Sequence, residues 1–414
     1  MSEPNKSLNL TMFRTLRHRQ FLWMWGANLF SNFGTSTYVL AINWIAVKEH
    51  GGIGLGAITL AYGLSQFIFQ LFGGVVSDRF NRKVVFVITE SSALILAVIL
   101  ALFATDKFFP IWFLALMNGL NGAISAFDTP ARTTLINELV PGEDLVQAQQ
   151  LYGLAANTTS ILGPALGGLL LSLGDTAIAF WFNAFSFIPV LISLFFIHAH
   201  PRAKSHQGPS IPMLTSIVEG LGYVRQNEQV RTLILLMSIV MILGMPYQTL
   251  LPMFAHKVLH AGSSEFAALS SAVGLGGFLG TLMTTNLGNN PQSGRWLFYT
   301  SLMFGLFIFL FVESPVIHWA ALSVCLAGAC SAITLNLDSG LIQSFSPETF
   351  RGRMTSISGL NKGALSISAA LAGYASHYFG MVSIQIIFII LMVVSLLWLS
   401  PHLSKINQAT LVAE

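Results

Sequence analysis

Twelve long apolar segments, separated by short polar breaks, constrain the fold of this chain more than any other feature. They lie at roughly 20–47, 54–76, 84–105, 110–136, 148–173, 176–198, 230–255, 264–287, 296–312, 316–344, 354–378 and 381–400. A helix of such a length crosses the roughly 30 Å hydrocarbon core of a bilayer. Only 9% of the residues are charged, against about 25% in soluble domains. The chain is therefore predicted to be an all-α membrane protein with twelve transmembrane helices.

The distribution of Lys and Arg predicts the orientation. If the N-terminus is cytoplasmic, the cytoplasmic regions hold sixteen of the 20 cations and the outer loops hold three, with Lys362 inside a segment. Cytoplasmic loops of membrane proteins are enriched in Lys and Arg. Both termini are thus expected in the cytoplasm, in a multi-pass protein of the cell inner membrane.

The two halves of the chain repeat at an offset of 206 residues. Pro141 and Gly167 of the first half recur as Pro347 and Gly373 of the second. Such a parallel repeat predicts two six-helix bundles related by an axis along the membrane normal. The expected organisation is a cytoplasmic segment 1–19, a first bundle 20–198, a cytoplasmic linker 199–229 with an amphipathic helix, a second bundle 230–400 and a cytoplasmic tail 401–414.

A tight charged loop joins the second and third apolar segments. It resembles the G-x-x-x-D-[RK]-x-G-[RK]-[RK] signature of the major facilitator superfamily, and Asn81 stands where the second glycine is usual. Asparagine tolerates the left-handed conformation that glycine would supply, so the turn of this loop is compatible with the change. The resemblance implies the major facilitator fold and a gating role for the loop. The matching residues are Gly74, Asp78, Arg79, Arg82 and Lys83.

Other motifs narrow the resemblance. Gly163, Pro164, Gly167 and Gly168 resemble the G-P-x-x-G-G element of antiporters in the superfamily, although close packing of a kinked helix explains the same residues. The stretches 127–132, 139–141 and 351–354 are similar to those of the enterobactin-exporter and macrolide-efflux branch. That branch contains siderophore exporters and drug pumps.

Three acidic residues lie within the apolar segments, and they are the candidates for proton coupling. Glu90, Asp128 and Asp338 fall about 10–15 Å from the nearest segment end, at 1.5 Å per residue. Ionised carboxylates at that depth are costly, so each is suspected of a function. The alternative is a fixed ion pair: Arg132 lies four residues after Asp128, and it could instead reach Asp78 or Glu90 in a cytoplasmic charge network.

Polar side chains at helical spacing are candidates for lining a substrate cavity, with interhelical hydrogen bonding as the alternative. Lys362 needs an acid, water or an anionic ligand at its depth. It is expected either to pair with Asp338 or to attract a carboxylate-bearing or catecholate substrate. The cavity candidates are Asn28, Asn32, Gln66, Gln70, Tyr247, Gln248, Asn336, Asn361 and Lys362.

These features predict a secondary active transporter, a proton-coupled exporter of a small molecule such as a siderophore. The alternatives are a multidrug or macrolide efflux pump, an importer, and a non-transporting membrane scaffold or sensor. The sequence has no nucleotide-binding loop, metal-ligand constellation or hydrolytic triad, so no enzyme activity and no cofactor are expected. The expected partners are the substrate, protons and the lipid bilayer. A net charge of +3 does not suggest nucleic acid, and a monomer is expected.

Overall fold

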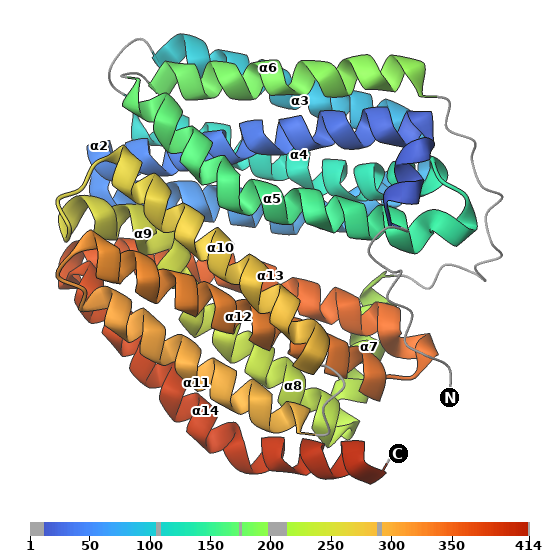
Figure 1. Cartoon of the computed structure of the whole chain (residues 1–414), viewed down its shortest axis with the longest axis vertical. Coiled ribbons are helices and arrows are strands. Elements are labelled where there is room, and N and C mark those ends of the chain that lie inside the picture. Colours follow the sequence, from blue (N-terminus) through green and yellow to red (C-terminus); the bar gives the residue numbers. More distant parts are fainter. Residues whose placement is uncertain (1–11, 105–108, 174–175, 198–212, 288–291, 413–414) are drawn as a thin grey trace. The chain divides into compact units, whose positions relative to one another are not determined.

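A computed structural model describes residues 12–104, 109–173, 176–197, 213–287 and 292–412 of the protein (Figure 1). Within these ranges every regular element is a helix. Nine of the described helical stretches are long and apolar enough to cross a membrane, and one of them, 19–70, contains the first predicted segment and most of the second. Helices α4 and α13, which carry more polar residues, cover the predicted segments 110–136 and 354–378. The prediction of an all-α fold with twelve crossing segments is confirmed.

The first half of the chain begins with one long helical stretch and continues through four shorter helices. Gly51, with φ 61° and ψ −145°, breaks the long stretch between the first two predicted segments. A residue other than glycine rarely adopts such a backbone conformation. The elements are η1 (Met12–Arg17), α2 (Arg19–Arg79), α3 (Arg82–Phe103), α4 (Ile111–Glu138), η3 (Gly142–Asp144), α5 (Leu145–Ser172) and α6 (Thr176–Phe196).

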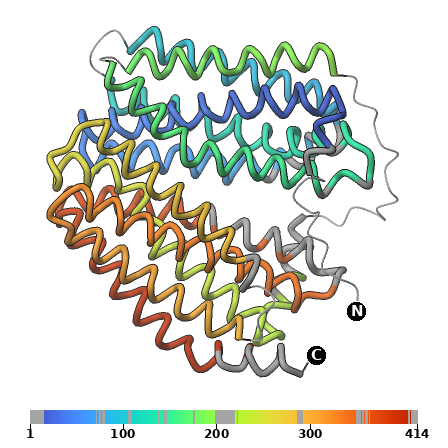
Figure 2. Tube along the Cα trace, in the orientation of Figure 1, coloured from blue at the N-terminus to red at the C-terminus, as the bar shows by residue number. Residues whose placement is uncertain are grey.

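The second half is also helical, and Figure 2 traces its path along the chain. A π-helical turn, η4 (Val240–Gly244), ends two residues before Pro246 and interrupts the predicted segment 230–255. Such turns occur where the regular hydrogen-bond ladder is disturbed. The remaining elements are α7 (Met213–Gln226), α8 (Glu228–Ile239), α9 (Pro246–Lys257), α10 (Ser263–Leu287), α11 (Ser293–Val312), α12 (Ile317–Phe345), α13 (Glu348–Phe379) and α14 (Met381–Val412).

Packing divides the chain into two compact units. The first comprises Met1–Ile42 with Leu64–Gln207, and the second comprises Asn43–Gly63 with Gly208–Glu414. In the first unit α3 packs against α4 and α6, and in the second α12 packs against α10 and α11 (Figure 1). The bundle and linker boundaries expected from the sequence stay a prediction.

Glycines allow close helix packing at matching places in the two units. A side chain at Gly73 would clash with the carbonyl of Ala126 in α4. In the second unit, one at Gly280 would clash with the carbonyl of Ala329 in α12. Small residues let helix backbones approach in this way where a hydrophobic driving force between helices is weak. The two units thus use the same packing device between equivalent pairs of helices.

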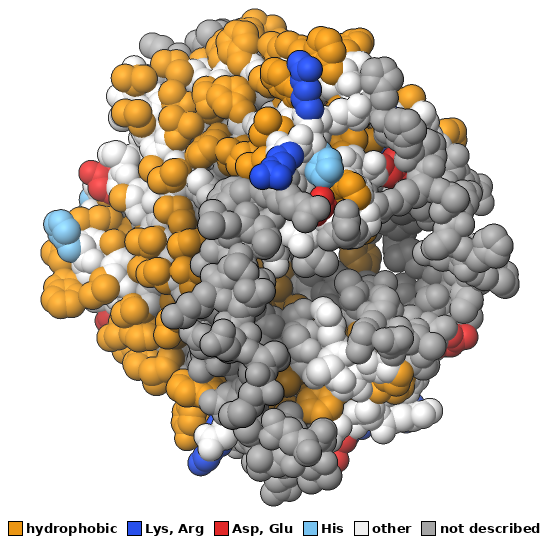
Figure 3. Space-filling view, turned by 45° about the vertical axis from the view of Figure 1, so that its right-hand side comes forward, with side chains coloured by type: hydrophobic (Ala, Val, Ile, Leu, Met, Phe, Trp, Pro, Cys, Tyr) orange, Lys and Arg blue, Asp and Glu red, His pale blue; other side chains and the backbone are white. Residues whose placement is uncertain are grey.

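Large apolar side chains are exposed on the described surface. Phe195 is 80% exposed, Phe379 70% and Trp398 67%. Figure 3 shows hydrophobic side chains over much of the described part of one face, with few charged ones among them. Exposure on this scale is unfavourable in water, whereas lipid chains solvate it. The surface is therefore that of a protein embedded in a bilayer.

Candidate functional site

The candidate site is a cavity of about 170 Å³ inside the first unit. Helices α2 to α6 all contribute to its walls. Polar and ionisable side chains converge on it, although it lies among membrane-spanning helices. Intramembrane ionisable groups are functional candidates by default. The polar residues that carry the argument are Asn32, Glu90, Asn121, Asp128, Arg132 and Tyr152.

A cation and two acids form the centre of this cavity. The Arg132 Nη2 atom lies 2.8 Å from Glu90 Oε1 and 2.7 Å from Asp128 Oδ2. Asp128 and Arg132 are one turn apart on α4, and Glu90 reaches them from α3. One guanidinium nitrogen therefore donates to both carboxylates. With both acids ionised, the three side chains together carry one negative charge.

The two carboxylates differ in how completely they are satisfied. Asp128 uses both oxygens, because Thr89 Oγ1 donates to its Oδ1 at 2.9 Å. Glu90 is 1% exposed, and its Oε2 has no hydrogen-bond partner within the described part of the chain. A buried, unsatisfied carboxylate oxygen is costly. Of the two acids, Glu90 is therefore the one whose negative charge is stabilised by fewer hydrogen bonds.

Local structure fixes the position of these groups. Helix α3 buries Phe86, Thr89 and Glu90 on one face, and the Phe86 ring centroid lies 5.3 Å from the Arg132 guanidinium carbon. This is within the range of a cation–π contact. Pro130 lies inside α4 without a backbone donor, and Thr134 Oγ1 donates to its carbonyl at 2.7 Å. The guanidinium is thus held by two acids and an aromatic face.

Other candidates of the first unit lie at varied distances from the centre. Asn32 lines the cavity, whereas Asn28 is buried and its side chain donates to the Met24 carbonyl at 2.9 Å. Gln66 is half-buried and Gln70 is exposed. None of the described contacts brings these two glutamines to the charged cluster.

The antiporter-like element lies at a tight helix contact. Side chains at Gly163 and Gly167 would press on Ser36 and Leu40 of α2, and Pro164 lies inside α5 between them. Gly168 is buried on the same helix. The geometry supports the packing alternative for these residues.

Candidates of the second unit lie in separate places. Asp338 is fully buried and has no hydrogen-bond partner among the described side chains, which do not include that of Lys362. The predicted pair between these two residues is therefore untested. Asn361 Oδ1 accepts a hydrogen bond from Ser238 Oγ at 3.0 Å, and Asn336 is exposed and donates to Thr281 at 3.2 Å.

The aromatic candidate of the second unit is part of its packed interior. Tyr247 is fully buried, with its ring centroid 5.7 Å from that of Phe304. Gln248 is exposed, and its amide donates to the Tyr247 hydroxyl at 3.4 Å. The geometry gives Tyr247 a packing role and leaves Gln248 accessible.

The charged loop is described only in part. The side chains of Asp78 and Arg79, and the surroundings of Gly74, lie outside the described residues. Arg82 pairs with Glu138 at the end of α4, and Lys83 Nζ donates to the Ile197 carbonyl at 2.8 Å. Arg132, grouped with this loop from the sequence, belongs to the buried cluster through the contacts described above.

Asn81 does not adopt the left-handed conformation that glycine would supply. Its φ is −65° and its ψ is 115°, which is extended backbone. Its side-chain oxygen accepts a hydrogen bond from the Lys83 backbone amide at 3.0 Å. Asparagine is favoured at this N-cap position because it satisfies a donor of the first helical turn. The residue therefore begins α3 instead of supplying the conformation of a glycine.

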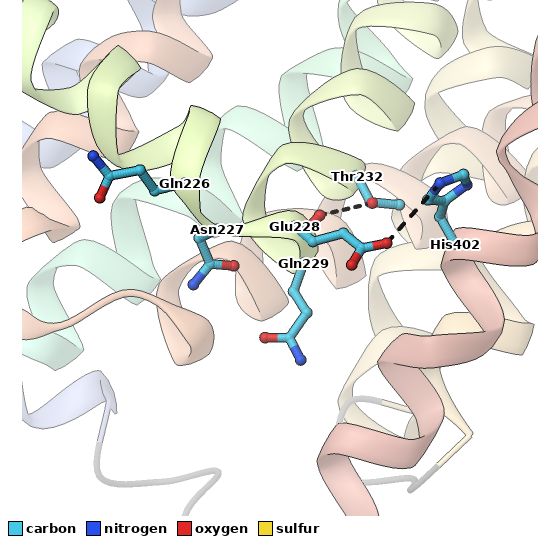
Figure 4. Close-up of a pocket in the computed structure, with 6 residues that line it drawn as sticks. All are labelled: Gln226, Asn227, Glu228, Gln229, Thr232 and His402. Atoms are coloured by element: carbon cyan, nitrogen blue, oxygen red, sulfur yellow. Dashed lines mark hydrogen bonds and ion pairs between the residues drawn. The ribbon is translucent and has the colours of Figure 1, made fainter.

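A second polar pocket, of about 290 Å³, lies in the second unit (Figure 4). It is formed by the start of α8 and by His402 of α14. Glu228 Oε1 and His402 Nε2 are 4.0 Å apart, and both side chains are more than a third exposed. Exposed pairs of this kind contribute little. The pocket therefore lacks the buried charge that distinguishes the cavity of the first unit.

Sequence reasoning missed several polar groups of the site, Asn121 of α4 among them. Thr89, directly before Glu90, satisfies Asp128, and Tyr152 lines the cavity from α5. The proximity of Thr89 to an intramembrane acid was an available signal. Tyr152 had no such signal, because its side chain reaches the cavity only through the packing of α5.

The protein resembles known transporters along most of its length. The family model described as "Transmembrane secretion effector" matches residues 10–414. The chain is 23% identical over 349 residues to the staphyloferrin A transporter of Staphylococcus aureus, covering 83% of this chain and 86% of that protein. It is 26% identical over 380 residues to the enterobactin exporter EntS of Shigella boydii, covering 90% and 88%.

A crystal structure of the nucleoside transporter NupG shares the fold, with a TM-score of 0.71 at 15% identity, covering 94% of this chain and 98% of that one. This likeness bears on the fold alone. The family match spans nearly the whole chain and agrees with the charged loop and the helical architecture. The chain is thus a multi-pass membrane protein that belongs to the transmembrane secretion effector family of major facilitator transporters.

Proposed function

We propose that this protein exports a small anionic molecule of the siderophore type, in exchange for protons that bind at the cluster of Glu90, Asp128 and Arg132. The protein works as a secondary transporter in the inner membrane, with both termini in the cytoplasm. The orientation rests on the distribution of Lys and Arg in the sequence.

One observation carries the proton-coupling proposal: a single guanidinium nitrogen contacts both the buried carboxylate of Glu90 and the half-buried carboxylate of Asp128. The cluster has one acid more than it has cations, so its ionised form leaves a negative charge inside the membrane. Binding one proton makes the cluster neutral and removes that cost. The cluster is thus a site for one exchangeable proton.

Glu90 is the acid that takes this proton. Its Oε2 is buried and has no partner within the described chain, so it has room for the added hydrogen. Asp128 has Thr89 and Arg132 on its two oxygens and remains the fixed counterion of the guanidinium. Protonation of Glu90 weakens its hold on Arg132 while the Asp128 contact persists. Binding and release of the proton therefore change one contact between α3 and α4, that of Glu90 with Arg132.

The substrate proposal draws on the relatives and on one cation. Two of the relatives are named for staphyloferrin A and for enterobactin. Lys362 lies in α13 next to the buried Asn361, where we propose that it attracts a carboxylate-bearing or catecholate substrate. A drug pump for cationic compounds would gain nothing from a lysine at that depth.

Transport by the purified protein in proteoliposomes tests this function. We expect movement of enterobactin or staphyloferrin A against its gradient when a pH gradient is imposed, and loss of that movement when a protonophore collapses the gradient. A macrolide, tested in parallel, should move much more slowly. Faster movement of the macrolide would identify a drug pump. No pH-dependent flux of either compound, in vesicles that contain folded protein, would favour the scaffold or sensor alternative.

A further inference from the structure

A large apolar groove opens between the start of α2 and the end of α6, away from the charged cluster. Its volume is about 1060 Å³, at the upper end of the roughly 300–1,000 Å³ of small-molecule sites. Both helical stretches belong to the first unit. The residues that carry the argument are Arg19, Trp23, Gly26 and Phe30 of α2, and Ile192 and Phe196 of α6.

The groove faces outward, and its walls are exposed. Trp23 is 57% exposed, Ile192 51% and Phe196 69%. Gly26 lies at an open position, because a side chain added there would meet nothing within 4 Å. In a membrane-embedded chain, such a surface is in contact with lipid chains. The open space at Gly26 makes a recess that a flexible acyl chain can fill.

The length of the groove corresponds to one leaflet. The eleven steps from Arg19 to Phe30 span roughly 16 Å at 1.5 Å per residue. Half of a hydrocarbon core of about 30 Å is roughly 15 Å. Trp23 lies one turn inside Arg19, as aromatic residues often do near the membrane–water interface. The groove therefore extends from the interface toward the middle of the bilayer.

One cation lines the interfacial end of the groove, and a second contacts the residue that follows Phe196. Arg19 begins α2, is exposed and lines the groove. Lys83 places its ammonium group 2.8 Å from the carbonyl of Ile197, the residue after Phe196. Each cation near a membrane surface contributes attraction to anionic lipid headgroups. An apolar groove of one leaflet's length with cations at its end matches the two parts of an anionic phospholipid.

We infer that this groove binds an anionic phospholipid, with its phosphate at Arg19 and Lys83 and an acyl chain along Gly26. By the predicted orientation, the lipid comes from the cytoplasmic leaflet. The site is independent of the substrate and proton sites proposed above.

Lipid titration of the full-length protein in detergent, read by native mass spectrometry, tests the inference. The probes are phosphatidylglycerol and phosphatidylcholine with identical acyl chains. We expect phosphatidylglycerol to bind several-fold tighter. Arg19→Gln should weaken its binding about fivefold, and Arg19→Lys should retain it. Arg295→Gln, which removes an exposed cation at the start of α11, is the matched control.

A second variant tests the apolar part of the site. A Cβ added at Gly26 would meet nothing within 4 Å, so Gly26→Leu should fill the recess and weaken binding of both lipids, whereas Gly340→Leu, at another open and exposed glycine, should not. Equal affinity of the wild-type protein for the two lipids would overturn the inference. The inference would also be overturned if the Gly26→Leu and Gly340→Leu proteins bound phosphatidylglycerol with the same affinity. This holds even if Gly26→Leu loses the binding of an apolar compound.

Discussion

Replacing Glu90 by glutamine separates the charge of the cluster from its shape. The glutamine side chain has the same length, and its oxygen can still accept a hydrogen bond from Arg132 Nη2, which lies 2.8 Å from Glu90 Oε1 in the wild-type protein. The substitution removes the excess negative charge, so Asp128 and Arg132 remain as a neutral pair. A neutral cluster has no reason to bind a proton. Glu90→Gln is therefore expected to uncouple transport from the pH gradient without dismantling the site.

The structure sets the size of this effect. One excess charge means one proton per transport cycle at this site, and one pH unit across the membrane corresponds to 1.36 kcal/mol for each proton. At zero membrane potential, a gradient of one pH unit can therefore sustain at most about a tenfold substrate gradient. In Glu90→Gln that ratio should fall to about one. A charge-assisted hydrogen bond worth about 1.5–3 kcal/mol is weakened, but the cost of burying a second ionised carboxylate is also removed, so we expect a net destabilisation of about 1 kcal/mol.

The assay compares two modes of transport in proteoliposomes held at zero membrane potential. Gradient-driven accumulation should be lost in Glu90→Gln, whereas exchange of labelled for unlabelled substrate should continue, because exchange needs no net proton movement. Asp128→Asn should behave similarly, since it also removes the excess charge. The matched control is Glu313→Gln, which neutralises an exposed acid at the end of α11. Its substrate ratio should match the wild type.

Infrared spectroscopy distinguishes the acid that binds the proton. On acidification, the band of protonated carboxyl groups should gain a component in the wild-type protein that is missing from the same measurement on Glu90→Gln. A full tenfold ratio in both Glu90→Gln and Asp128→Asn would refute the coupling role of the cluster. Asp338, which is buried without a described partner, would then be the acid to test.

Three further predictions concern other charges. Arg132→Gln leaves two acids without their cation and should lower the free energy of unfolding by about 3–5 kcal/mol. In a denaturation assay, the double variant with Glu90→Gln should recover part of this free energy. No recovery would contradict the contact of Arg132 with both acids. Lys362→Gln should weaken binding of anionic substrates far more than neutral ones, with Lys362→Arg retaining part, whereas equal losses would indicate a structural pair with Asp338. Asp78→Asn should slow transport and favour the inward-open state, and an unchanged rate with an unchanged conformational equilibrium would count against a gating role.

The helices could be predicted from the sequence because the bilayer imposes a length on each apolar segment. Details within the segments depend on single residues. The sequence predicts a break between segments 20–47 and 54–76. In the structure this break is the non-helical backbone conformation of a single residue, Gly51. Segment 230–255 is interrupted by a π-helical turn over Val240–Gly244, shortly before Pro246. Asn81 shows the opposite case, because a family pattern suggested a turn where capping by the side chain decides the conformation.

The candidate site could be predicted only in part. Helical spacing brought Asp128 and Arg132 together, since residues four apart share a face. Spacing along one helix cannot say which neighbouring helix faces that surface, so Glu90 was one of several possible partners. The same limit explains Asn28 and Asn32. They are one turn apart, yet the Asn28 side chain donates to the Met24 carbonyl of its own helix, whereas Asn32 lines the cavity.

A fixed ion pair and a proton-binding site are alternatives only while each acid is considered by itself. Arg132 balances one carboxylate, and its Nη2 atom contacts two. Whichever acid is ionised can serve as the structural partner, so the guanidinium stays compensated through a cycle of protonation and release. The second acid is then free to change charge without exposing a buried cation, which would cost several kcal/mol. In the proposed mechanism, the ion pair is thus what allows the neighbouring acid to exchange a proton inside the membrane.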